Sequence, residues 1–306
     1  MKVAIAGASG FIGSALAATL SGQGHEVRAL TRRPDDYRGA GSAVRADIND
    51  PASLTEALED QDAAYYLVHS LAGADFADQD RAGAHAFVDA ACTAGLRQIV
   101  YLGGLGDDTD DLSEHLRSRR EVESILMDAG PTTALRAGIV IGDGSISWEI
   151  LRQLVTRLPV MVTPRWVETR TQPIGLDDAL IYLSGVLGRP DAIGEVFEIG
   201  GPEPLTYRRM MTTVAQLLDR RLLIVPVPLL SPRLSSHWLR LITDVDLTTA
   251  RALVDSMTNE VIVRDNRIRE LLDHRPVSFE AAVSAALRAR EQPGGPAAAG
   301  PCTGLI

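Results

Sequence analysis

The sequence predicts an α/β protein with a doubly wound parallel sheet and a smaller, mostly helical C-terminal lobe. Three observations lead to this fold class. The first half of the 306 residues alternates short apolar runs with helical patterns, which is typical of a parallel sheet covered on both faces. A glycine-rich turn directly follows the first apolar run. The second half loses the regular alternation, so we expect it to build the lobe.

The elements of the first half follow from the apolar runs and from the residues that punctuate them. Ser113 suits a helix N-cap, and Gly130-Pro131 is a helix stop. A short strand is expected just before Ala46. The other expected strands are Val3–Ala6, Val27–Thr31, Ala63–Val68, Ile99–Leu102 and Ala134–Ile141. The expected helices are Phe11–Ser21, Ser53–Leu58, Asp78–Ala94 and Ser113–Asp128.

The second half carries mostly helical patterns. Helices are expected near Ser147–Arg157, Asp177–Leu187, Tyr207–Asp219, Leu234–Ile242, Leu247–Ser256 and Phe279–Arg290. Short strands are expected near Glu195–Ile199 and Leu222–Val225. The tail from Pro293 to Ile306 is rich in Pro, Gly and Ala, cannot build a core and is expected to be disordered.

Composition limits the classes of partner. Apolar residues make up 45% and charged residues 23%, as in ordinary globular proteins. The net charge of −10 argues against nucleic acid and against anionic membranes as partners. Two cysteines without metal-type spacing predict neither a disulfide framework nor a metal site. No run approaches about 18 apolar residues, and Met1–Ala6 is expected to form a strand rather than a signal peptide, so we expect a cytoplasmic protein. The expected assembly is a monomer or a homodimer.

The turn Gly7-x-x-Gly10-x-x-Gly13 lies between a strand and an amphipathic helix. Glycines also serve ordinary tight turns, but this context is the one that a dinucleotide site needs. There the backbone closely approaches a pyrophosphate and the helix N-terminus faces it. The residues expected to contact the dinucleotide are Gly7, Ser9, Gly10, Phe11, Ile12 and Gly13.

The end of the second expected strand discriminates between cofactors. Arg32 and Arg33 stand where NAD-binding units carry an acidic residue, so NADP(H) is preferred over NAD(H). The alternative is two solvated arginines. Farther on, Asp47 and Ile48 are candidates for contact with the adenine, although an aspartate there is also a routine turn residue.

Several stretches together resemble the atypical and extended short-chain dehydrogenase/reductase superfamily, in its NmrA-like NAD(P)H-binding branch and a bacterial, epimerase-like subgroup. They are the glycine motif, Arg32, Asp47-Ile48, Ile99–Leu105, His115–Arg119, Leu135–Gly142, Leu158–Trp166 and Gln172–Ile174. The resemblance implies a Rossmann-type fold. It also implies an NADP-binding domain over 1–142, a substrate lobe over 143–292 that returns strands and helices to the first domain, and the tail 293–306.

The usual reductases of this superfamily use a Tyr-x-x-x-Lys pair and a serine after the fifth strand. Alignment of the matching helix places His115 at the tyrosine and Arg119 at the lysine, and Gly103 or Gly104 replaces the serine. Lys2 is the only lysine, so no shift of register restores the pair. Residues four apart share a helix face, so His115 could donate a proton and Arg119 could contact the cofactor. The alternative is a solvated helix face with paired charges.

Other candidates lie where this superfamily binds nicotinamide and substrate. Val68, His69 and Ser70 end the fourth expected strand beside the expected nicotinamide ribose, and His69 is either a second acid–base candidate or a strand-end residue. Gly138 is expected to pass beneath the nicotinamide. The expected substrate pocket combines small and large apolar residues, which otherwise form the core of the lobe. They are Gly103, Gly104, Ser145, Trp148, Met161 and Trp166.

The function predicted from these residues is that of an NADPH-dependent oxidoreductase. Its expected substrate is a small apolar or aromatic carbonyl, a quinone or an enone. One alternative is an NADP(H)-binding sensor or regulatory protein without turnover, which the absent catalytic pair favours. Another is an epimerase or isomerase that retains NADP.

Overall fold

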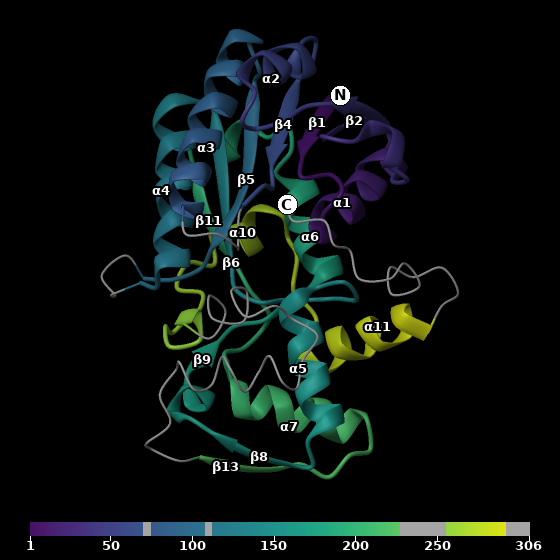
Figure 1. Ribbon diagram of the computed structural model, residues 1–306, viewed down its shortest axis with the longest axis vertical. Helices are drawn as coiled ribbons and strands as arrows, with labels where there is room; N and C mark the ends of the chain where they lie inside the picture. Colours follow the sequence, from purple (N-terminus) through teal and green to yellow (C-terminus); the bar gives the residue numbers. More distant parts are fainter. Residues whose placement is uncertain (70–74, 108–111, 227–254, 292–306) are drawn as a thin grey trace.

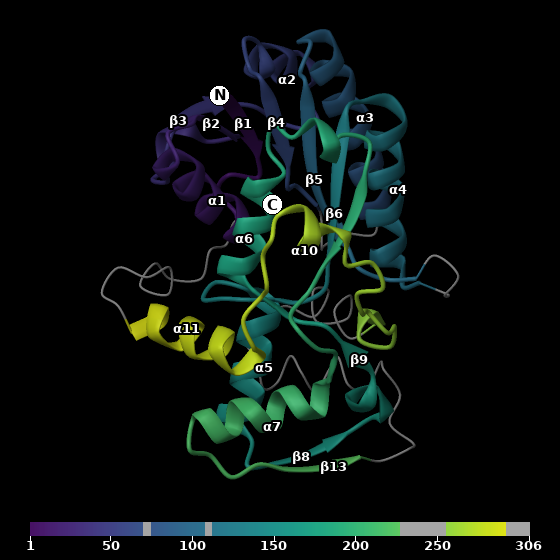
Figure 2. The same cartoon turned by 180° about the vertical axis from the view of Figure 1, so that it is seen from behind.

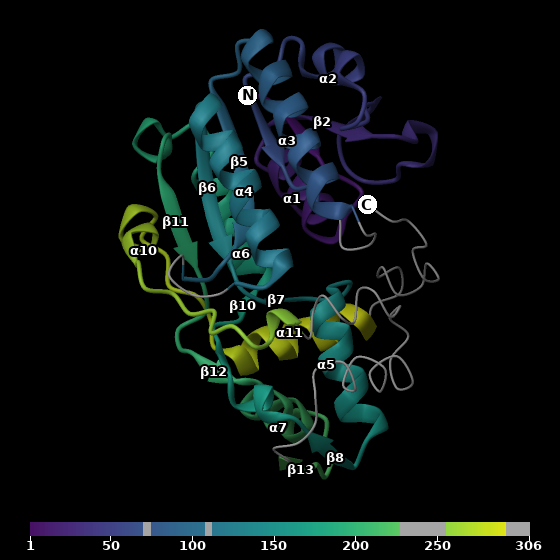
Figure 3. The same cartoon turned by 60° about the vertical axis from the view of Figure 1, so that its left-hand side comes forward.

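A seven-stranded parallel sheet organises the first half of the molecule, in the order β11-β6-β5-β4-β1-β2-β3 (Figure 1). The computed structural model describes residues 1–69, 75–107, 112–226 and 255–291. The strands are β1 (Lys2–Ala6), β2 (Glu26–Thr31), β3 (Ser42–Arg45), β4 (Ala63–Tyr66), β5 (Gln98–Gly104), β6 (Thr132–Ala137) and β11 (Val196–Ile199). Their carboxyl ends all point toward the lobe (Figure 3).

Helices cover both faces of the sheet, because successive strand residues point to opposite faces. In β1, Val3 and Ile5 pack with α1 (Phe11–Gly22) and α6 (Leu176–Gly185). Ala4 and Ala6 pack into the opposite cluster. The helices of that cluster are α2 (Pro51–Leu58), α3 (Phe76–Thr93) and α4 (Glu114–Ala129). The predicted doubly wound α/β fold is confirmed.

One predicted strand is wrong as a single element. The run Ala134–Ile141 divides at Gly138 into β6, in the main sheet, and β7 (Val140–Ile141). β7 pairs in parallel with β10 (Ile174–Gly175) outside that sheet. The apolar run is continuous in sequence, but the chain leaves the sheet at the glycine to enter the lobe.

The lobe has its own apolar core, which lies beyond the carboxyl edge of the sheet (Figure 2). Helices α5 (Ile146–Arg157), α7 (Tyr207–Leu217) and α11 (Phe279–Glu291) contribute to it. Two-residue strands β9 (Arg170–Thr171) and β12 (Leu205–Thr206) pair antiparallel near its upper side. β8 (Val160–Thr163), which the sequence did not indicate, pairs in parallel with β13 (Leu223–Pro226).

Some predicted features lie outside the described residues. They are the helix Leu234–Ile242, most of the helix Leu247–Ser256, the tail 293–306 and Ser70. The short helix α10 (Arg267–Leu271) was not predicted, and it packs Ile268 against the main sheet's core. Among the described residues no helix is long and apolar enough to cross a membrane.

Candidate active site

The glycine turn after β1 brings the backbone of two elements into close contact. Gly7 has φ +87°, a conformation that favours glycine. A Cβ on Gly13 would lie 2.1 Å from the carbonyl oxygen of Gly7, so any side chain there would push α1 off the strand. Gly142 faces the ring of Phe11, and a Cβ on it would lie 2.8 Å from Phe11 Cζ. The glycine turn and Gly142, which directly follows β7, therefore lie in close contact, and we call this arrangement the glycine cradle.

The N-terminus of α1 is open toward this cradle. Its N-cap is Gly10, which offers no side-chain hydrogen bond, and the first helical bond runs from Ser14 N to Gly10 O at 2.9 Å. Ser9 is exposed and Ile12 packs beside the core. Backbone N–H groups of the first turn and the helix dipole thus face the loop, which fits the pyrophosphate of a dinucleotide.

Three arginines stand at the carboxyl ends of β2 and β3. Arg32 and Arg33 are exposed, and Arg33 Nη1 lies 3.9 Å from Asp36 Oδ2 at the surface. Arg45, which the sequence reasoning missed, is the last residue of β3 and pairs in register with Thr31. Its signal was its place at the end of the expected third strand. This cationic edge suits a 2′-phosphate.

The adenine assignments stay predictions. Asp47 Oδ1 accepts a hydrogen bond from the backbone N–H of Asn49 at 3.0 Å, so the aspartate stabilises a local turn. Ile48 packs against α3, where a Cβ on Gly83 would lie 3.1 Å from Ile48 Cδ1. Val68 is half-buried beside the same core cluster.

The structure brings His69, His115 and Arg119 together. The imidazole rings of His69, just after β4, and His115, at the start of α4, have their centroids 6.0 Å apart. Arg119 lies one turn along α4, and its Nε–H donates to His115 Nε2 at 3.2 Å. The acceptor role of Nε2 assigns the proton of a neutral His115 ring to Nδ1. The two predicted acid–base candidates and the predicted cofactor contact thus form one cluster.

The protein environment keeps both histidines neutral. Burial, with the Arg119 guanidinium as a second cause, lowers the pKa of His115 to about 3. Burial, then Arg119 and His115, hold the pKa of His69 well below its usual value. The catalytic roles predicted for both histidines stay predictions. A neutral His115 offers an Nδ1–H donor, and Arg119 supplies the positive charge.

Gly104, the last residue of β5, makes room for the side chain of Arg119. A Cβ on Gly104 would lie 2.9 Å from Leu116 Cδ2 and 3.2 Å from Arg119 Cδ. The Tyr101 hydroxyl donates to the backbone carbonyl of Arg119 at 3.0 Å and holds this turn of α4. Gly103 is buried, and a Cβ there would lie 2.9 Å from the Tyr101 ring. Both glycines accommodate neighbouring side chains, and their assignment to a substrate pocket stays a prediction.

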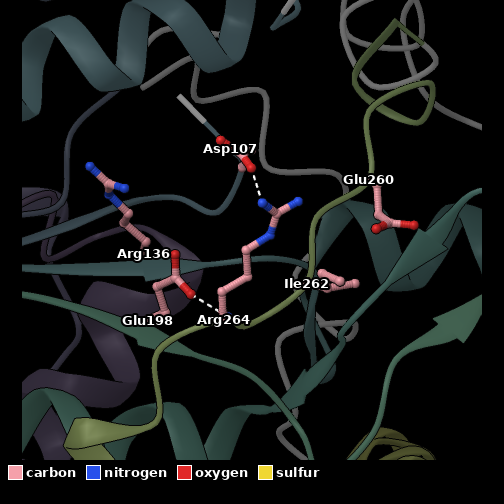
Figure 4. Close-up of a pocket in the computed structure, with 7 residues that line it drawn as sticks. Asp107, Arg136, Glu198, Glu260, Ile262 and Arg264 are labelled. Carbon is pink, nitrogen blue, oxygen red and sulfur yellow. Dashed lines mark hydrogen bonds and ion pairs between the residues drawn. The ribbon is translucent and has the colours of Figure 1, made fainter. Parts of the chain in front are cut away.

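Beyond this cluster, the ends of β5, β6 and β11 border a polar pocket of about 210 Å³ (Figure 4). Its charged groups already have protein partners. Arg264 pairs with Asp107, and its backbone N–H donates to Glu198 Oε2 at 2.6 Å. Arg136 pairs with the buried Glu123 of α4 at 2.6 Å, and Glu260 pairs with Arg170 at 2.8 Å. The charged side chains of this pocket are thus held by other protein groups. The lining residues are Gly106, Asp107, Arg136, Glu198, Glu260, Ile262 and Arg264.

The predicted pocket residues of the lobe lie in its core. Ser145 caps α5 by accepting from Trp148 N at 3.4 Å, and Trp148 and Met161 are fully buried. Within the described residues, the buried indole N–H groups of Trp148 and Trp166 have no hydrogen-bond partner. Gly138 faces the backbone of Gln172, where a Cβ would lie 3.4 Å from its carbonyl oxygen. Their roles toward substrate and nicotinamide stay predictions. Across the described residues no group of three His, Cys, Asp or Glu could hold a metal.

Comparison with known proteins supports the cofactor assignment. Residues 7–153 match a family model described as NAD(P)H-binding. A ceramide reductase of Caulobacter vibrioides is 27% identical over 286 residues, which cover 88% of this chain and 84% of that protein. An uncharacterized protein of Mycobacterium tuberculosis is 27% identical over 257 residues, 83% of this chain, and the match spans only 28% of that protein's length.

Solved structures share the fold at low identity. A nucleoside-diphosphate-sugar epimerase of Staphylococcus aureus superposes with a TM-score of 0.75 at 15% identity, covering 92% of this chain and 99% of that one. An NADPH-dependent quinone oxidoreductase of Escherichia coli, complexed with NADPH, superposes with a TM-score of 0.74 at 21% identity, covering 92% and 98%. Residues 7–153 thus match an NAD(P)H-binding family, and the chain shares its fold with these two solved structures.

Proposed function

We propose that the protein is an NADPH-dependent reductase of apolar carbonyl compounds, in which His115 and Arg119 take the place of the usual tyrosine and lysine. The observation that carries the proposal is the convergence of His69, His115 and Arg119 at the carboxyl edge of the central strands. This is the edge at which the glycine cradle opens. Ligands of open α/β sheets bind outside this edge.

Bound NADPH supplies the hydride. As negative charge develops on the carbonyl oxygen, the Nδ1–H of His115 donates a hydrogen bond to it, and the guanidinium of Arg119 stabilises the charge through the ring. For a ketone, the alkoxide is a stronger base than an imidazolate, so it takes the Nδ1 proton. Arg119 stabilises the resulting anion until water returns a proton to Nδ1. The arginine must stay protonated throughout, as guanidinium groups do.

The character of the cluster favours an apolar substrate. Both imidazoles are neutral, and the guanidinium of Arg119 is shared between His115 and the carbonyl oxygen of Leu102, at 3.4 Å. Among the described residues, the charged groups that act on the two rings include no carboxylate that could hold a cationic substrate. Two similar proteins act on ligands of this kind, as their names state: a ceramide reductase and a quinone oxidoreductase. Long-chain ketones and quinones are therefore the first compounds to offer.

The preference for NADPH over NADH is part of the proposal and rests on the arginines. Arg32, Arg33 and Arg45 give the β2–β3 edge three cations within reach of a 2′-phosphate, and the register of β2 and β3 brings Arg45 opposite Thr31. A guanidinium matches a phosphate in both charge and hydrogen-bond geometry.

The decisive experiment follows NADPH oxidation with a panel of long-chain ketones, quinones and enones, for the wild type, His115→Phe and His85→Phe. Phe keeps the ring and removes both nitrogens of His115. His85 is an exposed histidine on α3 and serves as the matched control.

We expect substrate-dependent oxidation that the control keeps and His115→Phe loses, with NADPH binding by calorimetry retained in all three proteins. Turnover that survives in His115→Phe would contradict the role of this ring. Tight NADPH binding without turnover on any compound would favour the NADP(H) sensor instead.

A further inference from the structure

The outer end of the lobe carries an exposed apolar face on a two-stranded sheet. β8 and β13 are parallel, with Val160 opposite Leu223 and Val162 opposite Val225. These four side chains alternate with buried ones, so all four lie on the same face. Their exposed fractions are 52%, 58%, 50% and 39%, respectively. We call these four residues the tip face.

The tip face points away from the rest of the described chain. The opposite side of the same strands, with Met161 and Ile224, is buried in the lobe core under α5 and α7. In Figures 1 and 2, β8 and β13 form the outermost layer of the lobe, at the end farthest from the sheet domain. The face is therefore available to a partner that approaches along the long axis of the molecule.

Three arginines lie at one end of this face. Because the strands are parallel, the residues before each one lie at the same end, which places Arg157 near Arg220 and Arg221. All three are exposed. Over 149–168 and 205–226 the sequence has seven arginines and three acids, a formal charge of +4, whereas the whole chain carries −10. Arg152 and Arg208 pair with Glu149 and Glu168, so the two segments that carry the tip face keep a positive balance, in contrast to the chain as a whole.

We propose that the tip face docks the protein on an anionic lipid surface, a role that goes beyond the proposed reaction and does not depend on it. Aliphatic side chains enter the boundary between headgroups and acyl chains, and neighbouring arginines contact anionic headgroups. The net charge of the chain led us to expect no membrane partner. Salt screens charges over about 8–10 Å, so a contact with a membrane depends on the charge near the contacting face rather than on the net charge of the chain.

A lipid surface suits the tip face better than a second copy does. A stable protein interface buries about 800 Å² and about 20–30 residues on each partner, far more than four half-exposed side chains and their neighbours provide. Two copies joined at this face would also bring their arginines together, with repulsion between like charges. Lipid headgroups offer negative charge instead.

The test is co-sedimentation of the full chain with vesicles of phosphatidylcholine alone and of phosphatidylcholine with about one third phosphatidylglycerol. One variant replaces the four tip-face residues with Thr, which keeps the branching that strands favour. A second variant is Arg220→Gln/Arg221→Gln. The control is Val277→Thr/Arg275→Gln/Arg288→Gln, at exposed positions elsewhere. Calorimetric binding of NADPH and the melting temperature verify that each variant is folded.

We expect salt-sensitive binding to the anionic vesicles by the wild type and the control. Their affinity for neutral vesicles should be lower by a factor of at least about ten. Both tip variants lose most of the binding. Equal binding to both vesicle types, no binding, or binding retained in the tip variants would overturn the proposal. A dimer in light scattering that the Thr variant abolishes would also overturn it and assign the face to a second copy. None of these results depends on turnover, so failure of the proposed reaction is measured separately.

Discussion

The two ends of the candidate site differ in how they are built. The glycine turn from Gly7 to Gly13 arises within seven consecutive residues, where the backbone itself makes the contacts and even one added carbon atom clashes. The His69–His115–Arg119 cluster instead draws its side chains from the end of β4 and from α4, and it needs a glycine at the end of β5 to make room. Cofactor binding thus depends on a local motif. The arrangement of the reacting groups depends instead on side chains from several elements that pack against one another.

The largest effect is expected at the cradle. Gly13→Ala places a Cβ 2.1 Å from Gly7 O, which is backbone and cannot move aside. We expect loss of cofactor binding and a fall of roughly 3 kcal/mol or more in the free energy of unfolding, as for severe overpacking. Urea unfolding and NADPH calorimetry measure both. Gly22→Ala in the same helix, where a Cβ would contact nothing within 4 Å, is the control and should not destabilise the protein. Equal behaviour of the two variants would refute the close packing.

The second effect separates reaction from binding. Arg119→Gln removes the charge that stabilises the developing oxyanion, so kcat should fall by about 100-fold or more. NADPH affinity should fall by a smaller factor, because Arg119 is also the predicted cofactor contact. Removal of this cation also removes one cause of the low pKa of His115, which should rise from about 3 but stay below 6.5 because the ring remains buried. NMR titration of the His115 ring checks the second point. An unchanged His115 pKa would show that Arg119 does not act on the ring.

The third effect tests the arginine edge of the cradle. Arg45→Ala and Arg32→Ala should each weaken NADPH binding by about tenfold, the value of one charge-assisted contact, and leave NADH binding unchanged. Calorimetry with both cofactors measures the difference. The control is Arg97→Ala. Arg97 is exposed and pairs with Asp62 at the amino ends of β4 and β5, away from the predicted cofactor site. Equal losses of affinity for NADH and NADPH would show that these arginines do not contact the 2′-phosphate.

The smallest effect is a dependence of stability on pH. Between pH 6.5 and about 3 the unfolded chain binds a proton at His115 that the folded protein does not, so the free energy of unfolding falls as the pH falls through this range. His115→Phe should lose less stability than the wild type when the pH drops from 7.5 to 5. Urea midpoints at the two pH values measure this change. Parallel losses in both proteins would show that His115 titrates normally in the fold.

Features carried by consecutive residues could be predicted from the sequence. The strand, glycine turn and helix at the N-terminus, the adjacent Arg32 and Arg33 after β2, and the spacing of His115 and Arg119 all depend on residues close together in the chain. The doubly wound parallel sheet followed from the alternation of strands and helices. The prediction of one strand over Ala134–Ile141 failed at Gly138, because the apolar pattern is the same whether the chain stays in the sheet or leaves it.

Only the tertiary structure decided which distant groups meet. Nothing local in the sequence indicates that Arg45 would lie opposite Thr31, that Gly104 would face Arg119, or that β8 and β13 would pair to expose four apolar side chains. It also decided the protonation of His115, because burial, which lowers its pKa most, is a property of everything packed around the ring. The physical reason is the same in each case. Periodicity and turn chemistry act over a few residues, whereas register, burial and charge proximity arise from contacts between segments far apart in the chain.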